Sequence, residues 1–521
     1  MESIVNAALA GAGRASLADA LPPATPEGTL IGSLADESAE QRLLLAAGVR
    51  AIYRLAGYVP EHIETLVHPA PAETKTICPP QVADLIQHIL GERVDDLLRE
   101  ALERMVAAGM ILPPGMLPLA LGSATVAQRP LMAQVAGERG VWLGSFNSAW
   151  SWVRESQAHY QDDQDALPAD AETIWQEGTP ADRLHILARW RATDPATARD
   201  EIAAVWRQEK ADFRVEMTEA LAINLSAADE PLLEAALDDR SGNVRAVAQR
   251  LLTRIPGCAY VERAKTRADA LLTMGKKKLV TTLPDVYEQA WERDGISAKA
   301  RHGTGERSWW LLRIIALTPP AHWVERFGLS PTDLIAAATD EHATDVLQGW
   351  SHAAVRYDAR EWTQPLVDMW TKRLAGRRNG DASPLEMCEL LLPHLPHSSL
   401  EAMARNILQH GESKQDISWE MLATALPRPW SVQLTRAWLA GLRTFAGELS
   451  ALKGYAPDWW ECSEEHVMRL PLACLDEALA PWDVAEAKSG NWQAVNWRLQ
   501  HQAFLKAVRL RQRIRDEIPG T

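Results

Sequence analysis

The sequence predicts an all-α protein whose central part is an α-solenoid of paired helices. Three observations predict it: apolar residues at helical spacing, a repeat of 31 residues between Trp175 and Gly257, and few β-branched runs. One helix of the second unit has apolar residues at i, i+3, i+4, i+7, i+8 and i+11, namely Val244, Val247, Ala248, Leu251, Leu252 and Ile255. This spacing forms one apolar helical face, whereas a strand would show alternation.

The first unit has the same pattern 31 residues earlier. In the second helix of each unit, the matching positions are Val244, Arg245, Ala248, Leu251 and Leu252 with Phe213, Arg214, Met217, Ala220 and Leu221. In the first helix they are Leu233, Ala236 and Leu237 with Ile202, Val205 and Trp206. Two amphipathic helices that recur every 30 to 45 residues, roughly, are typical of an α-solenoid.

Turn-forming residues separate the two helices of the second unit. They run from Asp238 to Asn243, and Asn243 is the predicted N-cap of the helix that follows. Pro256 and Gly257 are predicted to end that helix.

The run Leu237-Asp238-Asp239, followed by Val244-Arg245, Ala248 and Leu251-Leu252, resembles a HEAT-type repeat. In that family the Asp and Arg positions tie adjacent repeats together. The resemblance therefore implies structural roles for Asp239, Arg214 and Arg245. A third copy around Arg183 to Trp190 is partial, and no further copy is evident after Lys276.

Proline-rich joints and changes of pattern predict four regions. They are an N-terminal helix and Pro-rich linker (1–36), an N-terminal helical domain (37–170), the HEAT-like repeat region (171–330) and a C-terminal helical region (331–521). Individual helices are expected at about 1–20, 38–56, 80–90, 92–108, 309–317 and 492–514. Whether the parts before residue 110 and after 330 contain true repeats is left open.

Composition limits the function classes. A formal net charge of −15 argues against a nucleic-acid surface as the overall character of the protein, although it allows a local basic patch. Five scattered cysteines argue against a disulfide framework. Glu2 stands where a signal peptide carries Lys or Arg, and no stretch reaches the roughly 18 apolar residues that span a bilayer. We expect a cytoplasmic protein, with its 21 Trp used mainly in packing.

The segment from Leu112 to Trp152 is the most distinctive in the chain. Its Gly137-Glu138-Arg139-Gly140 run is able to present backbone N–H groups and a guanidinium to an anion. The alternative is a tight interhelical turn with Trp residues packed beneath it. The candidate partner-binding residues of this segment are Arg139, Trp142, Asn147 and Trp150.

A second candidate surface is basic. Residues 229–280 hold ten Lys/Arg against seven Asp/Glu, whereas residues 151–230 hold eight against seventeen. The run Lys276-Lys277-Lys278 is therefore a candidate for binding an acidic partner. The alternative is an ordinary solvated basic face.

The segment 112–152, with Trp175–Gly178 and the two repeats, resembles a bacterial family of uncharacterised proteins. Genes of that family tend to lie near those for a MoxR-type AAA ATPase, a von Willebrand factor A protein and a SWIM zinc-finger protein. The family has no established activity, so the resemblance implies a component of an ATPase-linked assembly and no catalytic residues.

No pattern predicts a catalytic, cofactor or metal site. Metalloprotease, CxxC, nucleophile-elbow and dinucleotide motifs are missing. His394 and His397 are separated by Pro396, which breaks the helix that would align them as ligands. Cys462, His466 and Cys474 have a spacing unlike that of known zinc sites, which favours helical core.

Two function classes remain. The favoured one is a non-catalytic scaffold or adaptor for a protein partner, for which the family resemblance suggests an AAA ATPase or a von Willebrand factor A protein. The alternative is a nucleic-acid-binding or DNA-processing helical-repeat protein of the glycosylase type, suggested by the abundant Trp and the local basic patch. The oligomeric state stays open.

Overall fold

The computed structural model confirms an all-α fold. It describes residues 4–5, 8–9, 26–33, 36–56, 68–92, 94–154, 156, 167–168, 170–300, 305–376, 383–411, 417–449, 460, 464–485 and 492–519. In these residues the only strands form two short two-stranded sheets. The chain divides into two units, residues 1–70 and 71–521. The division falls after Ala70, whereas the sequence suggests boundaries at 36, 170 and 330.

Unit 1 contains α3 (Pro26–Gly32) and α4 (Ala39–Ala56), and α4 confirms the helix expected at 38–56. Ser38 and Gln41 form a reciprocal cap at its start: the Gln41 N–H donates to Ser38 Oγ at 3.2 Å, and the Ser38 N–H donates to Gln41 Oε1 at 3.1 Å. Most of the helix expected at 1–20 lies outside the described residues.

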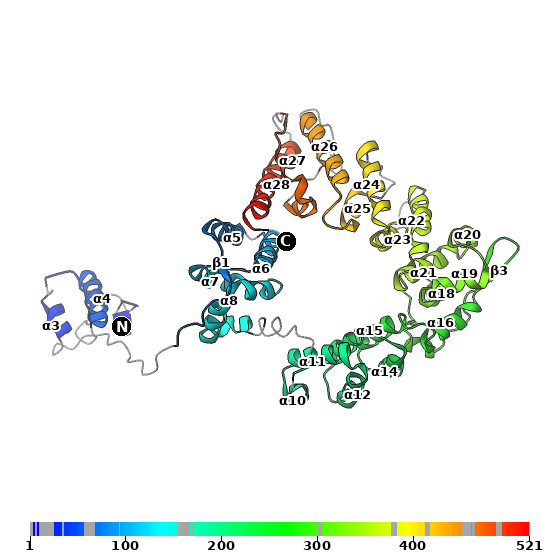
Figure 1. The fold of residues 1–521 in the computed structure, drawn as a ribbon, viewed down its shortest axis with the longest axis horizontal. Coiled ribbons are helices and arrows are strands. Elements are labelled where there is room, and N and C mark those ends of the chain that lie inside the picture. Colours follow the sequence, from blue (N-terminus) through cyan, green and yellow to red (C-terminus); the bar gives the residue numbers. More distant parts are fainter. Residues whose placement is uncertain are drawn as a thin grey trace. The chain divides into compact units, whose positions relative to one another are not determined.

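Unit 2 begins with a small helical bundle (Figure 1). Its elements are β1 (Thr76–Ile77), α5 (Pro80–Glu92), α6 (Asp95–Ala107), β2 (Met110–Ile111), η1 (Pro114–Met116), α7 (Leu117–Ser123), α8 (Arg129–Phe146) and η2 (Ser148–Trp150). Helices α5 and α6 confirm those expected at 80–90 and 92–108. Strand β1 pairs in parallel with β2, which anchors the start of the unit beside the end of α6.

The region predicted to contain repeats follows with paired helices. Its elements are α10 (Ala171–Glu177), α11 (Pro180–Thr193), α12 (Pro195–Val205), α13 (Ala211–Ala220), η3 (Ala227–Asp229), α14 (Glu230–Ala236), α15 (Gly242–Leu252) and α16 (Ala259–Asp269). The pairs α12/α13 and α14/α15 are the two predicted units. Phe213 and Val244, at matching positions, are both buried. The predicted N-cap at Asn243 is wrong, because α15 already begins at Gly242 and Ser241 is its N-cap.

A β-hairpin interrupts the helices after α16, and the sequence did not predict it. Strands β3 (Leu272–Met274) and β4 (Leu279–Thr281) pair antiparallel. The Gly275 N–H donates to the Lys278 carbonyl at 2.9 Å and closes the turn. A carboxylate oxygen of Asp340 accepts the Thr281 N–H at 2.8 Å, which fixes the base of the hairpin to a later part of the chain.

Helices continue to the end of the described chain. They are α17 (Ala290–Arg293), α18 (Glu306–Leu317), α19 (Pro320–Phe327), α20 (Pro331–Ala337), α21 (Ala343–Arg356), α22 (Arg360–Ala375), α23 (Ser383–Leu391), η4 (Leu392–His394), α24 (His397–His410), α25 (Trp419–Ala425), α26 (Val432–Glu448), η7 (Glu464–Arg469), η8 (Leu472–Cys474), α27 (Leu475–Leu479) and α28 (Trp492–Glu517). Successive helices such as α22 with α23 and α24 with α25 are in contact, whereas α18 packs mainly on α21, so helix-on-helix packing continues beyond Lys276. At Gly349 in α21, a Cβ would lie 2.7 Å from Ile315 Cβ of α18, so this close helix crossing requires glycine.

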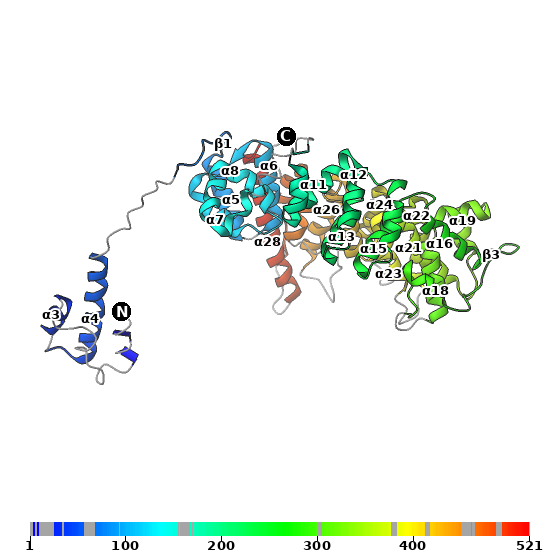
Figure 2. The ribbon, with the colours of Figure 1, turned by 90° about the horizontal axis from the view of Figure 1, so that it is seen from below.

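The last helix returns to the first bundle of unit 2. Figure 1 and Figure 2 both show α28 beside α5 and α6, and these helices are in contact. Arg511 Nε lies 2.7 Å from a Glu100 oxygen, and Lys506 Nζ lies 2.6 Å from a Glu92 oxygen. Basic residues of α28 thus join two parts of unit 2, which explains why they do not line one outer face of the helix.

Candidate interaction surfaces

The Gly137 segment is a break within helix α8. Gly137 has φ 65° and ψ −167°, a conformation that only glycine adopts without strain. The next two backbone N–H groups, those of Glu138 and Arg139, donate to the Glu73 carboxylate at 3.0 and 2.9 Å. A Cβ at Gly137 would lie 2.5 Å from an oxygen of that carboxylate. Glycine therefore permits both the break and the close approach of Glu73.

This geometry agrees with a tight turn between helices and corrects the anion-site interpretation. Two helical stretches meet at the single non-helical residue Gly137, and the N–H groups expected to meet an external anion are taken by Glu73 of the same chain. A carboxylate at this point is favourable because it faces the free N–H groups and the positive end of the second half of α8. Glu73 is 65 residues away in sequence, so no local pattern indicated the contact.

The four candidate residues of this segment have different environments. Arg139 is exposed, whereas Trp142 and Trp150 are partly buried. The Trp142 ring lies edge-on to Phe146, with 4.9 Å between ring centroids. The Asn147 side chain accepts the Ala149 N–H at 3.0 Å and so caps η2. Trp150 packs against the core, so Arg139 and Trp142 are the members with most surface to offer a partner.

Lys276, Lys277 and Lys278 occupy the turn of the β3–β4 hairpin, where all three are exposed. Two other cations of the basic stretch are engaged in ion pairs, since Arg263 and Arg267 both bind Asp294, at 2.9 and 2.6 Å. The hairpin turn carries three adjacent exposed cations. Figure 1 shows β3 and α8 in different parts of unit 2, so the structure does not bring the two candidate groups together.

The predicted repeat residues Arg214 and Asp239 bind each other. Arg214 of α13 donates from Nε and Nη2 to the two Asp239 oxygens at 2.8 and 3.0 Å, and both side chains are almost fully buried. Asp239 lies in the turn between α14 and α15, so this pair ties one helix pair to the next. Arg245 instead donates to the Asp239 carbonyl at 2.7 Å and stabilises the turn of its own pair.

Sequence reasoning missed a second buried ion pair. Arg191 of α11 donates to both carboxylate oxygens of Asp229 at 2.8 and 3.0 Å, and both side chains are 0% exposed. Burial alone would raise the pKa of Asp229, but hydrogen bonds from Arg191 and the Ser226 N–H hold it below its usual value. Arg191 lies just outside the partial repeat copy 183–190. The sequence feature that could have indicated this ion pair was a charged residue within a helical pattern.

An apolar stripe on α4 is exposed in unit 1. Leu44, Ile52 and Leu55 are 73%, 67% and 77% exposed. At 100° per residue these positions share one face of the helix. The opposite face carries Ala46, which is buried. The sequence predicted the helix but did not distinguish the buried face from the exposed one.

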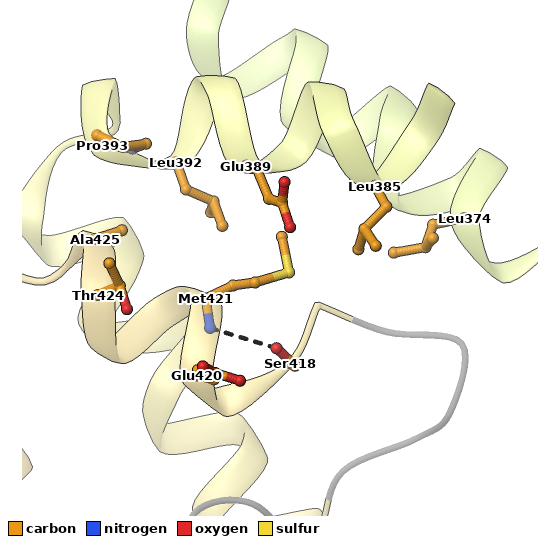
Figure 3. A pocket seen from close by; sticks show the side chains of 10 residues that line it. All are labelled: Leu374, Leu385, Glu389, Leu392, Pro393, Ser418, Glu420, Met421, Thr424 and Ala425. Atoms are coloured by element: carbon orange, nitrogen blue, oxygen red, sulfur yellow. Dashed lines mark hydrogen bonds between the residues drawn. The ribbon is translucent and has the colours of Figure 1, made fainter. Parts of the chain in front are cut away.

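A groove of about 490 Å³ lies between α23 and α25, and the sequence did not predict it (Figure 3). Its apolar lining consists of Leu374, Leu385, Leu392, Pro393, Met421 and Ala425. Its polar lining consists of Glu389, Ser418, Glu420 and Thr424. In Figure 3 the Glu389 carboxylate points toward the Met421 thioether. The volume is in the range of ligand sites, roughly 300–1,000 Å³.

Residues 3–518 match a family of unknown function, DUF5691. The chain belongs to this family. No curated protein and no solved structure matches it.

In the described part of this DUF5691 chain, the possible metal ligands are scattered and the cysteines are buried. This part contains no group of three or more His, Cys, Asp or Glu side chains arranged to hold a metal. Burial raises the pKa of the thiols of Cys78, Cys258, Cys388 and Cys474, which disfavours the reactive thiolate. Of the segment Cys462 to Cys474, Cys462 lies outside the described residues. No helix in the described ranges is long and apolar enough to cross a membrane.

The described tryptophans of the DUF5691 chain serve mainly in packing. Every Trp whose side chain is described is buried or partly buried. Trp438 stacks on His466, with 5.3 Å between ring centroids and 15° between planes. Burial and the neighbouring charge of Arg469 lower the pKa of His466 to about 3, so the ring is neutral. These rings stabilise helix contacts and are not displayed as a stacking platform for bases.

Proposed function

We propose that this protein is a non-catalytic, cytoplasmic helical-repeat scaffold of the α-solenoid type that binds protein partners. The proposal is carried by one observation: apolar surface is left open at the α23–α25 groove and along α4, while the charges that join the helix pairs are buried and paired. Open apolar surface of this kind marks interaction sites in proteins. Repeat proteins use such surfaces to bind partners.

The proposed partner is an AAA ATPase or a von Willebrand factor A protein. This part of the proposal rests on the gene neighbourhood of the family that the sequence resembles. The exposed Arg139 and the partly buried Trp142 of α8 are proposed contacts, because Arg and Trp are the residue types that contribute most at protein interfaces.

A nucleic-acid-binding protein is the second candidate, and the exposed Lys276–Lys278 turn favours it. Two observations weigh against it. None of the described Trp side chains is fully exposed, and Lys506 and Arg511 of α28 are engaged with Glu92 and Glu100.

The experiment is affinity capture of the tagged full chain from its native lysate, with and without ATP, read by mass spectrometry. The variant carries Arg139→Glu and Trp142→Ala, and keeps Gly137 and Glu73 so that α8 is unchanged. Arg360→Glu is the matched control, because Arg360 is 77% exposed and pairs with nearby Asp358 at the surface. We expect the native chain and the control to capture an ATPase or a von Willebrand factor A protein. We expect the variant to lose this capture. Recovery of the bait alone would overturn the proposal, and recovery of nucleic acid would favour the second candidate.

A further inference from the structure

The α23–α25 groove combines an apolar floor with an acidic rim. Leu374 and Leu392 are 2% and 1% exposed, so the floor is part of the core. Met421 and Leu385 are partly buried and stand on opposite walls (Figure 3). Helix α25 packs on α24 and η4, whereas α23 packs on α22. The two walls therefore belong to successive helix pairs, and the groove is the furrow between them.

Two carboxylates are placed at this furrow without a cation among the described residues that line it. Glu389 and Glu420 are exposed, and neither forms an ion pair or a hydrogen bond with another described residue. None of the ten lining residues is Lys or Arg. The Ser418 hydroxyl is engaged in capping α25, since it accepts the Met421 N–H at 3.3 Å. The charge presented to an occupant is thus negative on both walls.

We propose that this groove binds an amphipathic helical segment of a partner protein, with aliphatic side chains on the floor and a Lys or Arg between Glu389 and Glu420. This inference rests on the proposed scaffold function and specifies its partner chemistry. An apolar groove between helices selects apolar side chains at i, i+3 or i+4, and i+7 of a bound helix. The two unpaired carboxylates select a basic residue and disfavour an acidic one by like-charge repulsion. Met421 adapts to the bound side chain because its unbranched thioether fills irregular gaps.

The test uses the full-length protein and two fluorescently labelled synthetic helices. Both have leucines at i, i+4 and i+7. One has lysines beside the leucine face, and the other has glutamates at the same positions. Binding is measured by fluorescence anisotropy as a function of salt. In parallel, the Met421 methyl resonance is followed in protein labelled at its methionine methyl groups and assigned with Met421→Leu.

The variant for this test is the charge reversal Glu389→Lys with Glu420→Lys. Both residues are exposed, so we expect the unfolding midpoint to be unchanged. Glu386→Lys is the matched control, because Glu386 is an exposed residue of the same helix α23 that does not line the groove.

The expected result has four parts. The lysine helix binds the native chain and the Glu386→Lys control, and it shifts the Met421 resonance. Its binding weakens as the salt concentration is raised. The double reversal binds the lysine helix on the order of tenfold more weakly, which corresponds to about 1.4 kcal/mol, and gains affinity for the glutamate helix. Equal binding of both helices by the native chain would overturn the inference. So would an unshifted Met421 resonance, an unaffected double reversal, or no binding of either helix.

Failure of this inference is distinguishable from failure of the scaffold function. If the native chain captures a protein partner from the lysate and the double reversal captures it equally well, the scaffold function stands and the groove is not its site. If the native chain captures no protein partner, the scaffold function is overturned, regardless of whether the synthetic helices bind.

Discussion

Replacing Asp229 with Asn tests how the helix pairs are held together. The two groups of the Arg191–Asp229 pair are 0% exposed, and the guanidinium also donates to the Ile223 carbonyl at 3.0 Å and the Leu221 carbonyl at 3.1 Å. Asp229→Asn keeps the shape of the side chain but leaves the Arg191 charge buried without a counter-charge. Removing one partner of a buried pair costs about 3–5 kcal/mol. We therefore expect this loss for Asp229→Asn.

The control is an ion pair at the surface. Arg250 and Glu219, 31 residues apart, also join one helix pair to the next, but their side chains are 50% and 47% exposed. Solvent screens such a pair, which contributes about 0–1 kcal/mol. Glu219→Gln should therefore change the free energy of unfolding by less than a third of the Asp229→Asn effect.

The assay is hydrogen exchange read by mass spectrometry, because a chain of this length need not unfold in one step. Peptides from α11 and α14 should lose protection in Asp229→Asn and keep it in Glu219→Gln. Urea unfolding followed by tryptophan fluorescence gives the size of the change. If the two variants lose the same free energy of unfolding, the buried pair does not hold these helices together and the reasoning is refuted.

Three further predictions concern the rest of the chain. Gly137→Ala should lower the free energy of unfolding by about 1–3 kcal/mol, because alanine is strained in this backbone conformation. It should also displace the Glu73 carboxylate, which would be seen as faster hydrogen exchange in α8. Unchanged hydrogen exchange would contradict the geometry. His466 has a folded pKa of about 3 against an unfolded value of about 6.5, so the unfolded chain binds the proton first. Its contribution to stability should be complete above about pH 6.5 and decline toward pH 3, and His466→Phe should flatten this dependence in urea titrations; an unchanged slope would refute it. Replacing Lys276–Lys278 with serine should leave the unfolding free energy within about 0.5 kcal/mol, and a larger loss would mean that the turn has a structural role.

The helices could be predicted because their signals are local. Helical spacing places Val244 and Ala248 on one face of α15, and both residues are buried. The same spacing predicted α4 from Ser38 to Ala56 almost to the residue. Each of these elements is specified within its own sequence, so no knowledge of its neighbours was needed.

The other features depend on contacts between distant residues. Glu73 reaches α8 across 65 residues, and the hairpin of three-residue strands is fixed by Asp340, 59 residues after Thr281. The α23–α25 groove is formed by two helices whose individual patterns indicate only core and surface. Resemblance to HEAT repeats pointed to Arg214 and Asp239, but spacing alone does not show which carboxylate an arginine will meet.

The central claim is that this DUF5691 protein works by holding other proteins, and one measurement tests it most directly. The tagged chain is purified from its native lysate, treated with nuclease, and analysed by size-exclusion chromatography with light scattering and mass spectrometry. We predict a complex that keeps its mass after nuclease treatment and contains the bait with a protein partner. A complex that collapses to the bait on nuclease treatment, or a bait that elutes alone, would contradict the claim.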